Sequence, residues 1–354
     1  MPKLQIVVTK QSGVSYHRFV NPISYLDLGP DWTAELLWFG QDESKIDCDV
    51  LWYSKYLVTE PMFLEKIKEK GTKIIVDVDD DWELPPSHPL YRIWKDSGRD
   101  KRTVENIKLA DVVTCSTLKL QDKIRQYNKN TIVIANALPF GHSVYQPLPS
   151  EPREKMTFIY AGGSSHYNDL KLLQGKFKRI GTDSWIKERA QFFMAGYLPE
   201  QVNVKAQGVV LKKQIFGEWD KMASIFAATN SYRILPSDEL DTYINYFDMA
   251  DVSLIPLTDH PWNSYKSNLK ILESSAKHLP VICSKVEPYY PEMKNYPGII
   301  WVEKNDWIEP IKWSIKNPGA VKDMGESLAE KVWEDYNIQK WNEVRKQLLI
   351  SLIK

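Results

Sequence analysis

In this 354-residue chain, Lys270 and Glu273 are the residues whose types and spacing most clearly suit a binding or catalytic site. They lie three positions apart in a stretch typical of a helix. Residues at this spacing share a helix face, so the ammonium and the carboxylate are predicted to point the same way. A helix N-terminus with Lys266 and Lys270 beside it favours an anion such as phosphate. A neighbouring carboxylate can accept hydrogen bonds from two sugar hydroxyls. A solvated surface helix with a Lys–Glu pair is the alternative interpretation.

The flanking residues predict the elements that position this pair. Residues 252–255 form a short apolar strand ended by Pro256, and residues 280–283 form a second strand. The irregular segment 258–267 leads into the helix. We expect the helix to begin at Ser267 or Asn268, because either side chain can cap free backbone N–H groups.

The same alternation of short apolar runs and helical patterns continues through the chain. Runs of Val and Ile separated by helices predict parallel strands buried on both faces. The chain is too long for one ordinary hydrophobic core, and the proline-rich stretch QPLPSEPREK at 146–155 resembles a linker. The predicted strands are 4–8, 49–53, 73–78, 111–114, 131–135, 156–161, 191–195, 208–211, 231–235, 252–255, 280–283 and 299–302.

We therefore expect an α/β fold of two Rossmann-like parallel-sheet domains, residues 1–147 and 153–334, that face each other across a cleft. Residues 328–354 are predicted to be helical, with Trp341, Val344, Leu348 and Leu352 on one face. Such a stripe must be covered, so we expect residues 335–354 to pack back on the first domain.

Composition excludes some classes of protein. Lys and Arg together number 46, as do Asp and Glu, so no overall field recruits nucleic acid or an anionic membrane. Cys48, Cys115 and Cys283 are isolated in apolar surroundings and predict buried thiols of a reducing compartment. The start MPKLQIVVTK lacks a signal-peptide pattern, and no apolar run is long enough for a membrane span. We expect a cytoplasmic monomer or weak dimer.

Ligands of open parallel sheets bind outside the carboxyl ends of the strands, and polar loops follow several predicted strands. After the first strand, Gly13 allows close backbone approach, and Tyr16, His17 and Arg18 offer donors. An ordinary glycine turn is the alternative.

The loop 77–82, DVDDDW, follows the third predicted strand and contains Asp79, Asp80 and Trp82. Carboxylates this close repel one another, so some must meet a cation, a ligand hydroxyl or backbone N–H groups. A divalent ion at Asp77–Asp81 is one alternative, which we do not favour, and a solvated acidic turn is another.

The loop 162–169, GGSSHYND, follows the first strand of the second domain. Gly162, Gly163 and Ser164 form a weak phosphate-cradle pattern that is neither a Walker loop nor a dinucleotide fingerprint. His166, followed by Asn168 and Asp169, offers hydrogen bonds to a ligand or caps the next helix.

Together these segments resemble the GT-B glycosyltransferases, specifically the retaining group that uses nucleotide-diphosphate sugars. ADVSLIPL and KSNLKILESSAKHLPVICS resemble the donor-site signature of that family, and YAGGSSHYNDL resembles its phosphate loop. VVTCST and IVIANALPF are similar to first-domain segments. DVDDDWELPPSHP and SGVSYHRFVNP resemble a bacteriophage and bacterial polysaccharide-type branch.

The resemblance implies a site. It places Glu273 on the donor ribose, and Lys266, Ser267, Asn268, Leu269 and Lys270 near the phosphates. The family usually has a second glutamate eight positions earlier, near the transferred sugar, and this chain has Tyr265 there. Asp259, Asn263 and Tyr265 are the candidates for the missing sugar contact.

The resemblance also implies transfer from a UDP-glucose-like donor with retention and no required cofactor or metal. Lys270 and the helix N-terminus would stabilise the leaving diphosphate, and the donor phosphate would help take the acceptor proton. We expect His17, Asp79 and Asp80 on the acceptor side as catalytic candidates, with Tyr16, Arg18 and Trp82 beside them.

The acceptor stays open. Between Arg92 and Lys129 there are ten basic and five acidic residues, with Tyr91 and Trp94 adjacent, so contact with a phosphate backbone is one interpretation of this region. The resemblance implies a hydroxymethylated base in phage DNA as one candidate acceptor. A solvated helical surface is the alternative for this region, and glycan, protein or lipid-linked acceptors remain. A nucleotide-sugar binding module without transfer activity is a further alternative. A dehydrogenase is disfavoured because no G-x-G-x-x-G follows residues 4–8.

Overall fold

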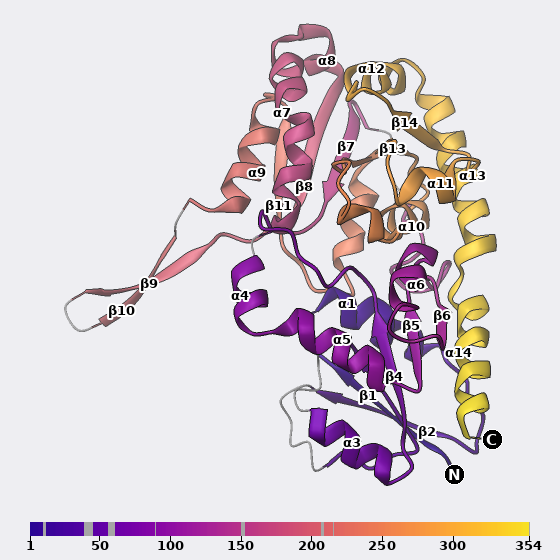
Figure 1. Cartoon of the computed structure of the whole chain (residues 1–354). Coiled ribbons are helices and arrows are strands. Elements are labelled where there is room, and N and C mark those ends of the chain that lie inside the picture. Colours follow the sequence, from indigo (N-terminus) through magenta and orange to yellow (C-terminus); the bar gives the residue numbers. More distant parts are fainter. Residues whose placement is uncertain are drawn as a thin grey trace. The chain divides into compact units, whose positions relative to one another are not determined.

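The computed structural model describes residues 1–9, 12–38, 45–55, 61–88, 90–149, 153–206, 209–214 and 216–353 (Figure 1). The chain divides into two compact units. Unit 1 contains residues 1–140, 260–269 and 333–354, and unit 2 contains residues 141–259 and 270–332. A ten-residue segment, His260–Leu269, thus belongs to unit 1 although both of its neighbours along the chain belong to unit 2.

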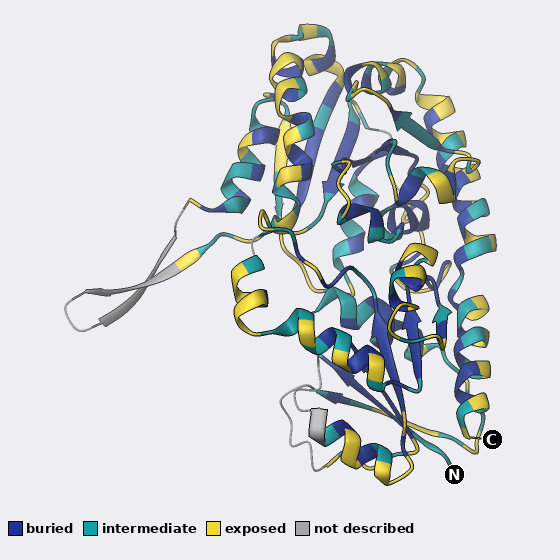
Figure 2. Ribbon diagram, in the orientation of Figure 1, coloured by how far each residue is buried: buried dark blue, intermediate teal, exposed yellow. Residues whose placement is uncertain are grey.

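Unit 1 is built on a six-stranded, entirely parallel sheet in the order β2-β1-β3-β4-β5-β6. The inner strands β1, β3, β4 and β5 are mostly apolar and nearly all of their residues are buried, as the Val/Ile runs predict (Figure 2). The edge strand β2 is largely exposed, and its polar start gave no strand signal. The strands are β1 Lys3–Val8, β2 Thr33–Trp38, β3 Val50–Ser54, β4 Lys73–Val78, β5 Val112–Cys115 and β6 Thr131–Val133.

Helices of unit 1 connect these strands. The first connection continues from α1 through a π-helix, η1, into α2, and π-helical turns often occur at functional sites. The bounds are α1 Gly13–Ser15, η1 Tyr16–Val20, α2 Asn21–Ser24, α3 Pro61–Glu69, α4 Tyr91–Asp96, α5 Arg99–Leu109, α6 Leu118–Ile124, η5 Asn263–Tyr265 and α14 Ile338–Ile353.

Unit 2 has a second six-stranded parallel sheet, in the order β11-β8-β7-β12-β13-β14. The chain runs from β7 outward to β11, then returns to β12 on the other side of β7 and continues to β14. The strands are β7 Met156–Ala161, β8 Ala190–Tyr197, β11 Tyr232–Pro236, β12 Val252–Ile255, β13 Val281–Ser284 and β14 Ile299–Val302. The α/β fold with two parallel sheets is confirmed.

The predicted strand 208–211 is not part of this sheet. Val209–Gln214 forms β10, which pairs antiparallel with β9, Gln201–Ala206, in a separate hairpin. Gly208 lies outside the described residues. The apolar run Val209–Leu211 is too short to distinguish a sheet strand from a hairpin arm, so the pattern alone did not separate them.

Helices cover both faces of the second sheet (Figure 1). Their bounds are η3 Ser164–His166, α7 Tyr167–Thr182, α8 Ser184–Arg189, α9 Glu218–Ala227, η4 Tyr243–Met249, α10 Leu269–Ala276, α11 Tyr289–Met293, α12 Ile308–Lys316 and α13 Pro318–Tyr336. The expected helix start at Ser267 or Asn268 agrees with the start of α10 within two residues, which is the usual uncertainty of helix ends.

The tail is two helices, not one. α13 ends at Tyr336, and residue Asn337 pairs with Leu138 before α14 begins. Leu348 and Leu349 are buried against the unit 1 core, in a cluster that includes Leu4 and Ile6 of β1. Trp341, Val344 and Leu352 pack on the same cluster, which confirms that the apolar stripe returns to the first unit. None of the helices in the described ranges is long and apolar enough to cross a lipid bilayer.

Candidate active site

The strand order of unit 2 creates a reversal point between β7 and β12. Because the chain leaves these neighbouring strands in opposite directions, the loops at their carboxyl ends diverge and leave room for a ligand. The glycine loop begins at Gly162, directly after β7. After β12 the chain runs through residues 256–268 into α10, so the two strongest sequence motifs follow the two strands at the reversal point.

Lys270 lies against the glycine loop. Its Nζ donates a hydrogen bond to the Ala161 carbonyl at 2.5 Å and stands 5.1 Å from the centroid of the Tyr160 ring. A Cβ atom at Gly162 would approach both the Lys270 Nζ and the Tyr160 hydroxyl to 2.6 Å. Glycine at position 162 therefore makes room for the ammonium of Lys270. The sequence predicted both residues but not their contact.

Glu273 is buried on the same helix, with 6% of its surface exposed. Its Oε1 accepts a hydrogen bond from the Tyr243 hydroxyl at the start of η4. Burial raises the pKa of the Glu273 carboxyl, and the Tyr243 hydrogen bond and the charge of Lys270 only partly oppose that rise. Tyr243 lies 30 residues earlier in the chain, in a stretch with no motif, so the sequence offered no signal for it.

Asp169 organises the rest of the glycine loop. His166 Nδ1 lies 2.8 Å from Asp169 Oδ2, and the backbone N–H of Thr258 donates to Oδ1 at 2.9 Å. The Thr258 hydroxyl also donates to Asp169. Burial disfavours the charged form of Asp169, yet these bonds outweigh it and lower its pKa. Asp169 thus ties the loop after β7 to the loop after β12, and His166 contributes to that link. Gly163 and Ser164 lie beside it and are at least partly exposed.

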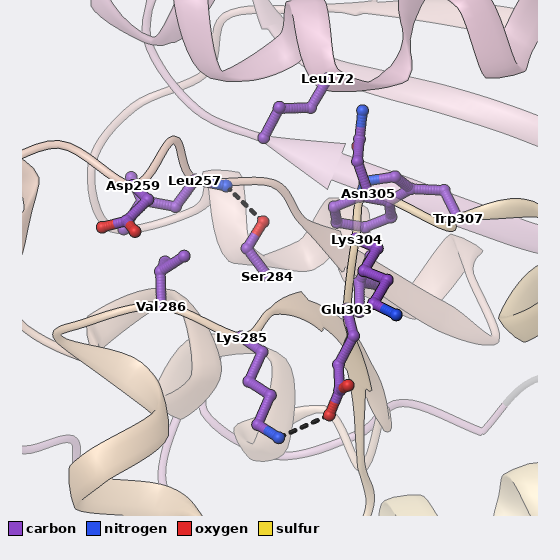
Figure 3. A pocket seen from close by; sticks show the side chains of 11 residues that line it. Leu172, Leu257, Asp259, Ser284, Lys285, Val286, Glu303, Lys304, Asn305 and Trp307 are labelled. Carbon is purple, nitrogen blue, oxygen red and sulfur yellow. Dashed lines mark hydrogen bonds and ion pairs between the residues drawn. The ribbon is translucent and has the colours of Figure 1, made fainter.

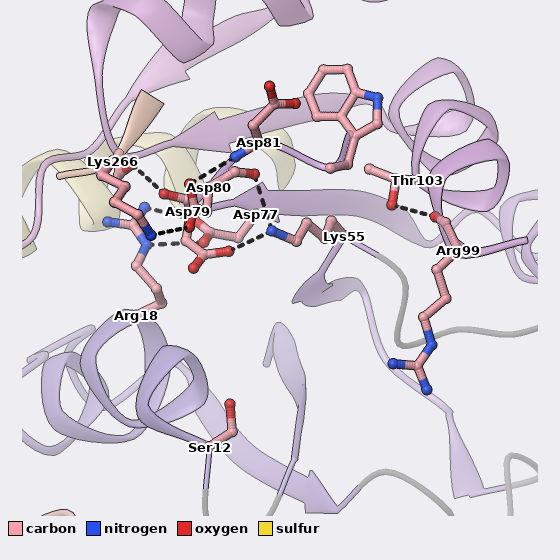
Figure 4. A network of polar contacts seen from close by, with 12 residues as sticks. Ser12, Arg18, Lys55, Asp77, Asp79, Asp80, Asp81, Arg99, Thr103 and Lys266 are labelled. Carbon is pink, nitrogen blue, oxygen red and sulfur yellow. Dashed lines mark hydrogen bonds and ion pairs between the residues drawn. The ribbon is translucent and has the colours of Figure 1, made fainter. Parts of the chain in front are cut away.

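In unit 1, every aspartate of the segment DVDDDW has its own cation, and Figure 4 shows those of Asp77, Asp79 and Asp80. The cations come from four different segments of the unit. The pairs are Arg18–Asp77 at 2.7 Å, Lys55–Asp79 at 3.1 Å, Lys266–Asp80 at 3.2 Å and Lys123–Asp81 at 2.7 Å. The mutual repulsion of the carboxylates is met by protein cations. In the part of the chain that the structure describes, no group of His, Cys, Asp or Glu side chains is arranged to hold a metal ion.

This pairing limits proton transfer by the catalytic candidates of unit 1. Burial opposes ionisation of Asp79, but Lys55 and Arg18 outweigh burial and lower its pKa. Burial lowers the pKa of His17 to about 4. A general base works best when its pKa is near the working pH, so both groups are weak bases at neutral pH.

Three of the predicted acceptor-side and catalytic residues are buried in unit 1. His17 is 4% exposed, Arg18 3% and Trp82 0%. Arg18 is held by Asp77, Asn136 and the Ile134 carbonyl. Its guanidinium therefore binds buried groups inside unit 1 in this structure. Tyr16 is partly exposed, and Gly13 has open space where a Cβ would stand.

The segment His260–Leu269 separates residues that the sequence grouped together. Lys266 belongs to unit 1, where it pairs with Asp80 and lies 4.0 Å from the Trp262 ring centroid, whereas Lys270 belongs to unit 2. Tyr265 packs on the unit 1 core, with Lys119 and Lys123 at 5.4 and 5.1 Å from its ring.

The remaining predicted donor-site residues are also divided between unit 1 and unit 2. Ser267 accepts a hydrogen bond from Asn136, and Asn263 and Asn268 are buried. Leu269 is the first residue of α10. Asp259 is exposed in unit 2. The structure thus brings Gly162, Lys270 and Glu273 into one unit. It adds Tyr160, Tyr243 and Thr258, which the sequence did not single out.

No protein-family model and no curated protein matches the chain. Solved structures do. Sucrose-phosphate synthase from Thermosynechococcus elongatus aligns with a TM-score of 0.72 at 11% identity, over 100% of this chain and 99% of that one. A glycosyltransferase from Rickettsia africae aligns with a TM-score of 0.69 at 12% identity, over 100% and 99%. Anabaena Alr3699/HepE, solved in complex with UDP, aligns with a TM-score of 0.67 at 11% identity, over 99% and 100%. Identities this low show the fold alone, which is the GT-B fold that the sequence resembles.

Proposed function

We propose that this chain is a glycosyltransferase that moves a sugar from a nucleoside diphosphate sugar, of the UDP-glucose type, to an acceptor hydroxyl. The observation that carries the proposal is the arrangement of Lys270 and Glu273 on α10 at the reversal point of the unit 2 sheet, with the Lys270 ammonium against Gly162. A cation, a helix N-terminus and a glycine loop suit a diphosphate, and a buried carboxylate one turn away suits a ribose.

The fold neighbours support this choice of ligand. HepE structures are described in complex with UDP, with UDP and glucose, and with UDP-glucose. The proposal transfers that ligand class to this chain because the chemistry of Lys270, Glu273 and the glycine loop suits a nucleoside diphosphate. In the proposed complex Lys270 exchanges the Ala161 carbonyl for a diphosphate oxygen, and the Glu273 carboxylate accepts hydrogen bonds from ribose hydroxyls.

The proposed reaction retains configuration and needs neither a metal nor a protein base. The acceptor oxygen forms a bond to the anomeric carbon as the bond from that carbon to the diphosphate breaks. The acceptor proton passes to the departing phosphate. The lowered pKa values of Asp79 and His17 support this route, because neither side chain is a good base at neutral pH. Lys270 and the α10 N-terminus stabilise the negative charge of the leaving group.

The proposed acceptor is a polyanion that presents a hydroxyl group, such as DNA with hydroxymethylated bases. This rests on a set of exposed cations on and around α4, α5 and α6 of unit 1: Arg92, Lys95, Lys101, Lys108, Lys119, Arg125 and Lys129. Counterion release makes such binding weaken steeply with salt. If duplex DNA does not bind, or binds without salt dependence, the acceptor is not DNA and a neutral glycan becomes the leading class.

The donor is tested by thermal-shift measurements with a panel of nucleoside diphosphate sugars, followed by chromatography of released nucleotide. We expect Lys270→Ala and Glu273→Ala each to weaken binding about 10- to 100-fold, since each removes a charged or buried hydrogen-bonding partner. Lys322→Ala, at an exposed position of α13, is the matched control. Donor affinity unchanged from wild type in both site variants would contradict the proposal. Tight binding without any hydrolysis or transfer would indicate a binding module.

A further inference from the structure

Unit 2 has a second concave site, at the carboxyl ends of β12, β13 and β14 (Figure 3). The pocket has a volume of about 380 Å³, within the usual range of small-molecule sites. Leu257 and Asp259 enter it from the loop after β12, Asn305 and Trp307 from the loop after β14. An ion pair between Lys285 and Glu303, at 2.5 Å, crosses one side.

Two side chains in this pocket, Asp259 and Asn305, have hydrogen-bonding groups without a partner among the described residues. Within the described ranges, the Asp259 carboxylate accepts no hydrogen bond and forms no ion pair. The Asn305 Oδ1 accepts a hydrogen bond from Trp307 Nε1 at 2.8 Å. That bond fixes the amide and leaves its Nδ2 hydrogens without a partner among the described residues. One side thus offers an acceptor and the other a fixed donor.

The backbone at this loop is unusual. Lys304 and Asn305 have φ values of +51° and +58°, in the left-handed region that non-glycine residues seldom adopt. Two such residues in succession turn the chain sharply after β14, and they bring the Asn305 amide to Trp307 and the pocket. Backbone conformations of this kind concentrate at ligand sites.

The balance of the lining identifies the ligand class. Asp259 and Glu303 carry two negative charges, and Lys285 and Lys304 carry two positive ones, so the pocket has no net preference for an ion. Leu172 of α7, Leu257, Val286 and Val302 add apolar side chains to the lining. Separated donors and acceptors among apolar side chains suit a neutral polyhydroxy ring, which presents both hydroxyls and C–H groups.

We propose that this pocket binds a neutral saccharide unit, with the Asp259 carboxylate and the Asn305 amide as the two main contacts. The residues that line this pocket include neither Lys270 nor Glu273, but they do include Asp259, one of the sequence candidates for a sugar contact. Thr258 directs its hydroxyl to Asp169, whereas its two neighbours, Leu257 and Asp259, line the pocket. The proposal does not depend on the proposed transferase function.

The test is isothermal titration calorimetry of the full chain with glucose, galactose, mannose, N-acetylglucosamine and xylose, and separately with UDP. Asp259→Asn keeps the shape of the side chain and removes its charge. Asn305→Asp keeps the acceptor for Trp307 and removes the donor. Asp323→Asn, on the exposed surface of α13, is the matched control, and Glu273→Gln reports on the other site.

We expect at least one saccharide to bind, and each pocket variant to weaken it about tenfold or more while Asp323→Asn and Glu273→Gln leave it unchanged. UDP binding, if present, is expected to be unaffected by Asp259→Asn. Absence of binding by every saccharide overturns the proposal. So does a loss of saccharide affinity in Glu273→Gln with none in Asp259→Asn, which would place the sugar in the other site.

Discussion

Glu273 is a buried carboxylate that accepts a hydrogen bond from Tyr243. Four residues later, Lys277 is also buried. Lys277 in turn pairs with Asp248 at 2.6 Å, so η4 holds α10 through Tyr243 at one end and Asp248 at the other. The carboxylate is therefore held in place before any ligand arrives. Fixed polar groups of this kind lose little freedom on binding, which favours affinity.

The raised pKa of Glu273 leads to a prediction about pH. The ionised carboxylate accepts hydroxyl hydrogen bonds more strongly than the protonated acid, so affinity for a nucleotide sugar should rise with pH and level off. The midpoint should lie above the ordinary range of a glutamate, because burial raises the pKa of Glu273. The diphosphate of a nucleotide sugar is esterified at both ends and keeps its charge across this window. Calorimetric titration at a series of pH values measures the midpoint.

Two variants separate this carboxylate from other titrating groups. Glu273→Gln should remove the pH dependence. Tyr243→Phe removes a hydrogen bond that lowers the pKa of Glu273, so the midpoint should move to higher pH. A midpoint that stays the same in Tyr243→Phe, or a pH dependence that survives in Glu273→Gln, would assign the titration to another group.

At the scale of elements, Asp77 of β4 and the acidic turn after that strand are held by cations from η1, from the residue that follows β3, from α6 and from the segment His260–Leu269. That segment is anchored to unit 1 by Lys266–Asp80, by Asn136–Ser267 at 2.7 Å and by the packing of Tyr265. It ends at Leu269, where α10 begins. The anchor thus fixes the chain immediately before the helix that carries Lys270.

The Lys266–Asp80 pair should show energetic coupling. Its side chains are only 16% and 23% exposed, so screening by solvent is incomplete. We expect Asp80→Lys or Lys266→Asp alone to weaken nucleotide-sugar binding and lower stability. The double exchange should restore much of both, with a coupling of about 0.5–3 kcal/mol. Urea unfolding and donor titration of the four proteins measure this cycle.

The control is the Lys322–Glu326 pair on α13, which is 4.0 Å apart with side chains 78% and 52% exposed. Exchange of these two charges should change little. If the Lys266–Asp80 cycle shows no more coupling than the control, the ion pair is not an anchor.

At the scale of the whole molecule, the sequence predicted local structure well and long-range partners poorly. Residues 299–302 were predicted as a strand and form β14, because a short Ile/Val run flanked by a proline–glycine turn and a charged turn has few other solutions. The helix α5 was not predicted, because RDKRTVENIKL has few apolar positions to reveal a period.

In the candidate site, too, the sequence predicted local relations between residues but not their long-range contacts. Lys270 and Glu273 share a helix, so their spacing was informative. Tyr243 reaches Glu273 across 30 residues, and Lys266 reaches Asp80 across 186, and no local pattern encodes either contact. Whether a lysine near a helix start faces a ligand or an aspartate of another element is decided by tertiary packing.

The tail helix joins the two ends of the chain in one core. Leu349 is fully buried with Leu4 and Ile6, more than 300 residues earlier. Leu349→Ala should destabilise unit 1 by about 2–5 kcal/mol through lost burial and the cavity left behind. Gln347→Ala, two residues away and on the exposed side of α14, should stay within about 0.5 kcal/mol of wild type. Urea unfolding, with hydrogen exchange of β1 to locate the effect, measures both. Equal stability of the two variants would contradict this packing.

The non-contiguous border of unit 1 restricts how this protein can be recombined. A fragment of residues 141–332 would carry His260–Leu269 without its partners, and would leave Trp262 and Tyr265 stripped of the apolar cluster on which they pack. Exposed aromatic surface of that kind promotes aggregation. A chimera that joins unit 2 to a foreign first unit would therefore also need the unit 1 surface on which His260–Leu269 packs, including Asp80, Lys119 and Lys123. The two halves are not interchangeable modules, and a graft has to include the ten residues and the surface that receives them.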